Sequence, residues 1–256
     1  MTLRSATNPP ARRVIGVVAA KGGLGASTVA LDWARALGQE NARCLLLEIA
    51  GGDIAWMAGG SPHAFTENVA TGAARPQDAV VAIEPHVDLL ATGNAWAVHG
   101  APSVFDIERL VINLTAGSWK RWVIDIGNTR PEFASPIWKV CTTIAVVLDD
   151  DIASVSRTYA LTRRLSDLGW GDRIALVFNR LADGAQAEAL RERFAQVTRQ
   201  FLGRTWPLCG VVPDGPPERR RLTIAAWASD TQQSKSSESI HNHRINGPAV
   251  TADNIG

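Results

Sequence analysis

The stretch VIGVVAAKGGLGASTV, residues 14–29, decides the fold of this chain. It begins with an apolar, largely β-branched run at 14–18 and continues through a loop that contains Gly22, Gly23 and Gly25. A helical pattern follows at once. A strand, a glycine loop and a helix in this order present backbone N–H groups and a helix N-terminus to an anion. The stretch therefore predicts a phosphate-binding loop, and the alternative is a glycine turn that holds no ligand.

The loop has the outline of the P-loop motif G-x-x-x-x-G-K-[ST], with one change. The motif requires lysine after its last glycine, whereas this chain has Ala26, followed by Ser27 and Thr28. The binding frame is present, but the ammonium group that neutralises the β- and γ-phosphates is missing from its usual place. We expect the main-chain amides of residues 22–27 to hold a nucleotide and the Ser27 hydroxyl to bind its Mg²⁺.

The bulk composition favours one large α/β domain. The chain has 256 residues, of which 46% are hydrophobic and 20% are charged, so it can bury a large core. The net charge of +1 gives no overall attraction to nucleic acid or anionic membrane. The three cysteines are far apart in apolar runs, which indicates buried thiols in a reducing compartment. No apolar run approaches the ~18 residues that span a bilayer. These features predict a cytoplasmic protein, unless a partner recruits it to a pole or a membrane site.

Apolar strand-like runs alternate with helical patterns along the chain. Strands are predicted at 14–20, 43–49, 87–91, 122–126, 142–148, 173–178 and 208–212, and helices at 27–39, 105–116, 152–168 and 185–201. Residues 51–82 are rich in Gly and Ala and show only weak helical patterns. This alternation predicts a mainly parallel sheet with helices on both faces. We expect this domain to span 13–228, between a flexible tail at 1–12 and a disordered tail at 229–256.

The pattern Lys-Gly-Gly-x-Gly-x-[Ser/Thr]-Thr at residues 21–28 resembles the deviant P-loop of the ParA/MinD family of dimeric ATPases. The resemblance implies a P-loop NTPase fold, ATP and Mg²⁺ as ligands, and a nucleotide-dependent homodimer. In that family the lysine at the position of Lys21 reaches across the dimer interface to the partner's nucleotide. The Gly-Ala-Ser-Thr ending is similar to the pilus-assembly branch known as CpaE/TadZ, whose members often lack the second lysine.

The resemblance assigns roles to the loop and to two acidic residues. It implies that the nucleotide is bound by Gly22, Gly23, Leu24, Gly25, Ala26, Ser27 and Thr28, with Lys21 as a catalytic residue. Asp125 ends a β-branched run, as does the Walker B aspartate that helps to hold Mg²⁺. We therefore assign it a catalytic role and, together with Ser27, a metal-binding role. Glu48 stands where the family usually has a catalytic aspartate, and the alternative is a structural hydrogen bond.

Three further positions resemble the family's base-binding site. Asn179 follows the predicted strand 173–178, where the family places an asparagine whose amide reads the adenine edge. Arg180 follows it directly. Pro213 belongs to a segment at 208–214 that is similar to the family's Gly-x-Ile-Pro-x-Asp segment, whose backbone frames the base. Before the predicted helix 152–168, the aspartates 149–151 are typical of a helix N-terminus.

The sequence leaves three functions open. Loss of a charged contact to the phosphates slows phosphoryl transfer on the order of 10²-fold or more. We therefore favour a weak or inactive ATPase that acts as a dimeric localisation factor for a machine such as a pilus or secretion apparatus. The first alternative is an active ATPase of DNA or cargo partitioning, with Arg219, Arg220 and Arg221 as a nonspecific DNA contact. The second is a scaffold of the same fold that binds no nucleotide.

Overall fold

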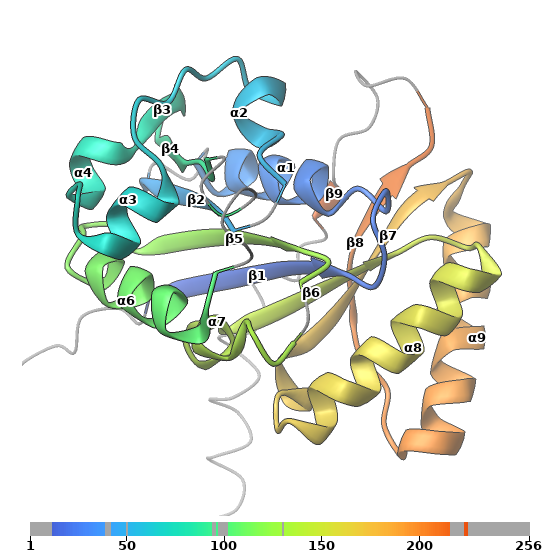
Figure 1. Cartoon of the computed structure of the whole chain (residues 1–256). Coiled ribbons are helices and arrows are strands. Elements are labelled where there is room, and N and C mark those ends of the chain that lie inside the picture. The colour runs from blue at the N-terminus through green and yellow to red at the C-terminus, as the bar shows by residue number, and fades with distance from the viewer. Residues whose placement is uncertain are drawn as a thin grey trace, which may run out of the picture.

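The structure is a computed structural model, and it describes residues 12–38, 42–49, 51–93, 96, 102–129, 131–215 and 223–224 (Figure 1). Residues 1–11 of the predicted N-terminal tail lie outside the described residues. So do the arginines at 219–221 and the predicted C-terminal tail at 229–256. Arg12 is described, and its guanidinium lies 4.6 Å from the ring centroid of Trp122 and donates to the carbonyl of Trp119 at 3.1 Å.

The elements follow each other in a repeating strand–helix order. They are β1 (Arg13–Ala19), α1 (Ala26–Gly38), β2 (Cys44–Glu48), α2 (Ile54–Met57), α3 (Thr66–Thr71), α4 (Pro76–Ala79), β3 (Val81–Glu84), β4 (Val87–Leu90), α6 (Val104–Thr115), β5 (Arg121–Gly127), α7 (Ser135–Val140), β6 (Thr143–Leu148), α8 (Ile152–Asp167), the 3₁₀ turn η1 (Gly171–Arg173), β7 (Ile174–Leu181), α9 (Gly184–Leu202), β8 (Leu208–Pro213) and β9 (Thr223–Ile224).

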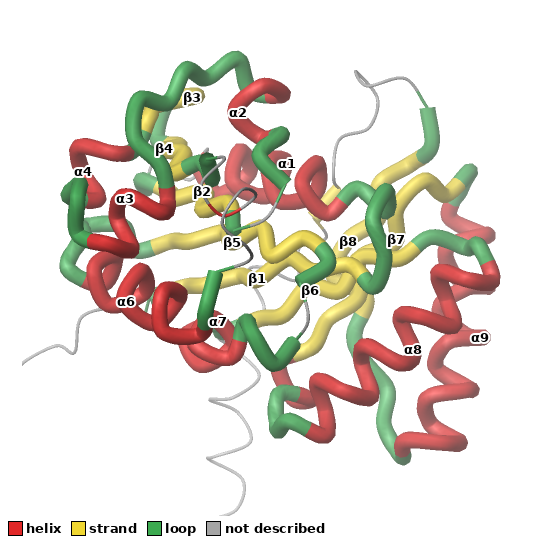
Figure 2. Tube along the Cα trace, viewed as in Figure 1, coloured by secondary structure: helices red, strands yellow, loops and turns green. Residues whose placement is uncertain are grey.

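The strands form one nine-stranded sheet in the order β3-β4-β2-β5-β1-β6-β7-β8-β9 (Figure 2). All neighbours from β4 to β8 run parallel, and only β3 and β9, at the two edges, are antiparallel. The predicted mainly parallel α/β architecture is therefore confirmed. Strand β1 lies between β5 and β6, so the loop that follows it leaves from the middle of the sheet.

Both faces of the sheet are covered by helices, as predicted. Side chains alternate along β1, so that Val14 and Val18 point to one core while Ile15 and Val17 point to the other. One core includes residues of α1 and α2, and the other includes residues of α3, α6, α7, α8 and α9 (Figure 1). A strand buried on both faces has to be apolar throughout, which explains the continuous apolar runs in the sequence.

The seven predicted strands and four predicted helices are all present, with ends shifted by a few residues. The weak pattern at 51–82 resolves into three short helices, α2 to α4, and leads into strand β3, which the sequence did not predict. These elements are four to six residues long, too short to show a clear period. None of the helices among the described residues is long and apolar enough to cross a bilayer.

Gly16 gives a test of how closely β1 packs on the residues around α7. A Cβ at this position would lie 2.8 Å from Sγ of Cys141 and 2.9 Å from Cδ1 of Ile126, both closer than normal contact. We expect Gly16→Ala to lower the free energy of unfolding by about 1–3 kcal/mol, measured by urea denaturation. The double variant Gly16→Ala/Cys141→Ala should lose less than the sum of its single variants, because the sulfur is gone. A Gly16→Ala protein as stable as the wild type would contradict this packing.

Candidate functional site

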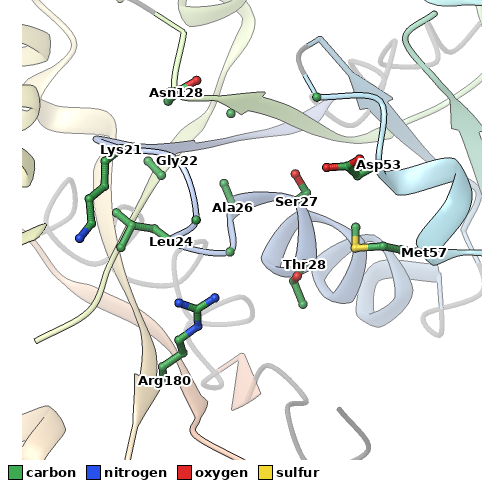
Figure 3. A pocket seen from close by; sticks show the side chains of 15 residues that line it. Lys21, Gly22, Leu24, Ala26, Ser27, Thr28, Asp53, Met57, Asn128 and Arg180 are labelled. Atoms are coloured by element: carbon green, nitrogen blue, oxygen red, sulfur yellow. The ribbon is translucent and has the colours of Figure 1, made fainter. Parts of the chain in front are cut away.

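The predicted phosphate loop lines a pocket of about 320 Å³ at the carboxyl ends of β1, β5 and β7. The loop residues 21–28 form one wall, and the other walls include Asp53, Met57, Asn128 and Arg180 (Figure 3). Ligands of open α/β sheets bind at this end of the strands. Met57 and Asn128 were not expected from the sequence. Met57 belongs to α2, a helix too short to predict, and Asn128 is the first residue after β5.

The loop holds its shape through glycine geometry and one side chain from β7. Gly23 and Gly25 have φ angles of 79° and 85°, in the left-handed region that favours glycine. Asn179 donates from Nδ2 to the carbonyl of Leu24 at 2.6 Å, and a Cβ on Gly25 would clash with the same amide. Asn179 is 5% exposed and does not line the pocket. Its amide thus fastens the loop to the sheet, and adenine recognition by this residue stays a prediction.

The backbone amides of the loop are available to a ligand. Helix α1 begins at Ala26, so the N–H groups of its first turn have no partner within the helix. Within the part of the chain that the structure describes, no hydrogen bond uses the N–H of Gly22, Gly23 or Ala26. The helix also has no acidic residue in its first turn. The N-terminal end of α1 therefore offers several unpaired donors and the positive end of a helix dipole to an anion.

Lys21 lines the pocket and forms an ion pair with α8. Its Nζ lies 2.8 Å from Oδ2 of Asp151, and the Lys21 side chain is 26% exposed. Asp151 is the N-cap of α8 and accepts a hydrogen bond from the Ser154 N–H at 3.1 Å. Lys21, followed by the Ser154 amide, holds the pKa of Asp151 below its usual value. The expected helix start after the aspartates is confirmed, and within one chain Lys21 is directed to this carboxylate.

Asp125 is fully buried beside the loop and is incompletely paired. Its Oδ1 accepts from the N–H of Gly127 at 3.0 Å, whereas its Oδ2 has no hydrogen-bond partner among the described residues. Burial raises the pKa of Asp125 to about 7, opposed by the nearby Ser27 hydroxyl and the Gly127 amide. A buried carboxylate oxygen without a partner is rare in folded proteins. Its place next to Ser27 fits a bound cation or a water molecule of its hydration shell.

No group of three or more His, Cys, Asp or Glu side chains able to hold a metal ion occurs among the residues that the structure describes. Mg²⁺ does not require such a group, because it keeps several waters and usually takes one or two protein oxygens together with substrate phosphates. Ser27 and Asp125 would be those protein groups, as the sequence predicts.

Glu48 pairs with Asp125 across the two strands, but its carboxylate turns to backbone amides. Oε1 accepts from Gly52 at 2.9 Å and from Ile54 at 3.1 Å, and Oε2 accepts from Thr92 at 3.2 Å. Burial raises the pKa of Glu48, and these amides oppose the rise. The residue makes the structural hydrogen bonds that were the alternative to catalysis, and it does not line the pocket. A catalytic role for Glu48 stays a prediction.

The remaining two predicted residues differ in their relation to the pocket. Arg180 lines it and has a φ of 60°, which is uncommon for any residue other than glycine. Pro213 ends β8 beside Leu181 and does not line the pocket. The pairing of β7 with β8 is irregular between Asn179 and Leu181, so Arg180 is the extra residue of a bulge.

The burial of Asp125 predicts a pH-dependent stability. Its folded pKa of about 7 lies above the value of about 3.9 in unfolded chains, so the carboxylate destabilises the fold progressively as pH rises from about 4 to 7. The penalty reaches at most about 4 kcal/mol above pH 7. We expect Asp125→Asn, which carries no charge, to gain stability over the wild type between pH 5 and pH 8 in urea denaturation.

Asp172→Asn is the matched control, because its side chain is 98% exposed, and its pH profile should follow that of the wild type. Parallel profiles for Asp125→Asn and the wild type would show that Asp125 is ionised without penalty, contrary to this burial.

No family model and no curated protein match the sequence. Solved structures do match. A ParA family ATPase from Chlorobium tepidum TLS is 20% identical with a TM-score of 0.67, covering 91% of this chain and 100% of that one. MinD from Pyrococcus horikoshii OT3, complexed with Mg-ADP, is 21% identical with a TM-score of 0.64, covering 80% and 82%. A chain of the MinC:MinD cell division protein complex of Aquifex aeolicus is 14% identical with a TM-score of 0.65, covering 95% and 100%.

These alignments extend over most of each chain. Because the sequence identities are low, the similarity shows the fold alone. The chain has the fold of the ParA- and MinD-type ATPases.

Proposed function

We propose that this chain is an atypical member of the ParA/MinD family that binds ATP with Mg²⁺, hydrolyses it slowly or not at all, and acts as a dimeric positioning factor. The machine that it positions would be a pilus, a secretion apparatus or a similar assembly. One observation carries the proposal: the loop at 22–27 keeps a phosphate cradle with free amides, while Ala26 replaces the lysine of the motif.

Nucleotide binding rests on main-chain groups that Ala26 does not alter. The unpaired amides and the N-terminal end of α1 attract phosphate oxygens whatever the side chain at position 26. Ser27 and Oδ2 of Asp125, which has no hydrogen-bond partner among the described residues, supply the kind of oxygen atoms that a hydrated Mg²⁺ takes from a protein, and this supports the proposal. The Mg-ADP complex of P. horikoshii MinD, which shares the fold, supports the same ligand class.

Slow hydrolysis follows from the charges that a single chain can bring to the phosphates. Phosphoryl transfer is catalysed mainly by positioning and by stabilisation of the charge on the transferred group. Ala26 removes one cation, and Lys21 is paired with Asp151 instead of being free. Loss of one such contact costs on the order of 10²-fold in rate.

A protein partner on this face is supported by exposed apolar side chains next to the pocket. Trp56 in α2 is 85% exposed and precedes the pocket residue Met57. Ile152 at the start of α8 is 83% exposed and follows Asp151. Exposed tryptophan in particular is enriched at protein interfaces. We therefore place the homodimer contact on the face that carries the pocket.

The experiment compares ATP affinity, ATP turnover and mass by light scattering for the wild type, Lys21→Ala and Ala26→Lys, with Mg²⁺ present. The wild type should bind ATP, form a dimer with it and turn it over slowly. Ala26→Lys should raise the turnover by at least about 10-fold, because it restores a cation to the phosphates. Lys21→Ala should bind ATP but lose the ATP-dependent dimer.

Lys139→Ala, an exposed lysine on α7 remote from the pocket, is the control and should behave as the wild type. Turnover by the wild type at an ordinary ATPase rate would refute slow hydrolysis and favour the partitioning ATPase. Absence of ATP binding in all the proteins would refute nucleotide binding and favour the scaffold.

A further inference from the structure

The two cationic side chains that line the pocket differ in whether they have a partner among the described residues. Lys21, Arg180 and Asp53 are its charged lining residues. Lys21 is already paired with Asp151 at 2.8 Å. Arg180, by contrast, has an exposed side chain, and the structure records no hydrogen bond or ion pair for its guanidinium within the described ranges. Among the described residues, the pocket beside the glycine loop thus contains one cation that has no protein partner.

The backbone of Arg180 is held in a conformation that its side chain disfavours. Its φ of 60° lies in the left-handed region, where glycine and asparagine are the usual residues. Arg180 is also the extra residue of the bulge between Asn179 and Leu181. Bulges re-aim side chains, and strained residues persist mainly at functional sites. The combination of strain and an unpaired charge at a pocket points to a ligand.

The neighbouring residue attaches the end of β7, and with it the backbone of Arg180, to the loop. Asn179 donates to the carbonyl of Leu24 at 2.6 Å. Arg180 comes next, and Figure 3 shows its guanidinium directed towards the loop between Leu24 and Thr28. A cation at this position can reach phosphate oxygens, whether it donates as the guanidinium of arginine or acts as the point charge of a lysine.

We propose that Arg180 binds the phosphate chain of the nucleotide and supplies the positive charge that Ala26 does not. This inference rests on the proposed nucleotide binding and adds the residue that compensates for the missing lysine. Arg180 binds as a cation from the wall of the pocket that the end of β7 forms, so the ground state keeps its affinity without an ammonium group at position 26.

The test measures binding of a fluorescent ATP analogue with Mg²⁺, and its displacement by inorganic tripolyphosphate, for the wild type, Arg180→Asn and Arg180→Lys. Asparagine accepts the left-handed backbone, so Arg180→Asn removes the charge without adding strain. We expect Arg180→Asn to weaken binding of both ligands roughly 10-fold to 100-fold, the effect of a charged hydrogen bond. Arg180→Lys should keep most of the affinity. Arg193→Gln, an exposed arginine on the outer side of α9, should bind as the wild type.

A double variant that moves the positive charge from position 180 to position 26 makes the test specific. In the Arg180→Asn background, Ala26→Lys should restore affinity to within about 3-fold of the wild type, because either cation serves the same phosphates. Melting temperatures verify that each variant folds, and Arg180→Lys alone decides the matter if Ala26→Lys does not fold.

Wild-type affinity in Arg180→Asn would overturn this inference and leave the proposed function intact. A loss that neither Arg180→Lys nor Ala26→Lys repairs, or a loss for the ATP analogue that spares tripolyphosphate, would also overturn it, because Arg180 would then act on the base or on the fold. A wild type that binds neither ligand would overturn the proposed function as well.

Discussion

The hydrogen bond from Asn179 to the carbonyl of Leu24 is the contact on which the site depends. It joins two segments that are 155 residues apart and holds the glycine loop against the end of β7. The contact requires glycine at position 25, because a Cβ there would clash with the same amide. The same attachment brings Arg180, the next residue of β7, to the pocket beside the loop. Holding a loop in its binding conformation before the ligand arrives lowers the entropy cost of binding.

Few charged groups around the loop are free to act on a ligand. Asp125 is buried and lacks a partner for one oxygen, Lys21 is neutralised by Asp151, and Ala26 contributes no charge. The fold carries the cost of the buried Asp125 carboxylate, as folds often do at functional sites. A bound cation at Ser27 and Asp125 would relieve that cost, so ligand binding and stability are coupled through the same carboxylate.

The sequence allowed the central sheet to be predicted because most residues of each buried strand are apolar, as a strand covered on both faces requires. It did not reveal β3 or the helix α2 that brings Met57 to the pocket, since four residues are too few to show a period. The positions of Asp125 and of the loop followed from local pattern and resemblance. The ion pair of Lys21 with Asp151 and the backbone hydrogen bonds of Glu48 did not, because they join segments whose approach only the folded sheet determines.

Main-chain amides and side-chain cations make different contributions to a nucleotide site. In the proposed site the amides of residues 22–27 would contact phosphate oxygens in the ground state, and these contacts do not require any particular side chain at position 26. An ammonium group at that position acts most strongly on charge that develops as the phosphoryl group is transferred. In the proposed function, alanine at position 26 would therefore lower the rate of hydrolysis more than the affinity for nucleotide. Such a loop would favour a long-lived bound state over rapid cycling, as the proposed positioning role requires.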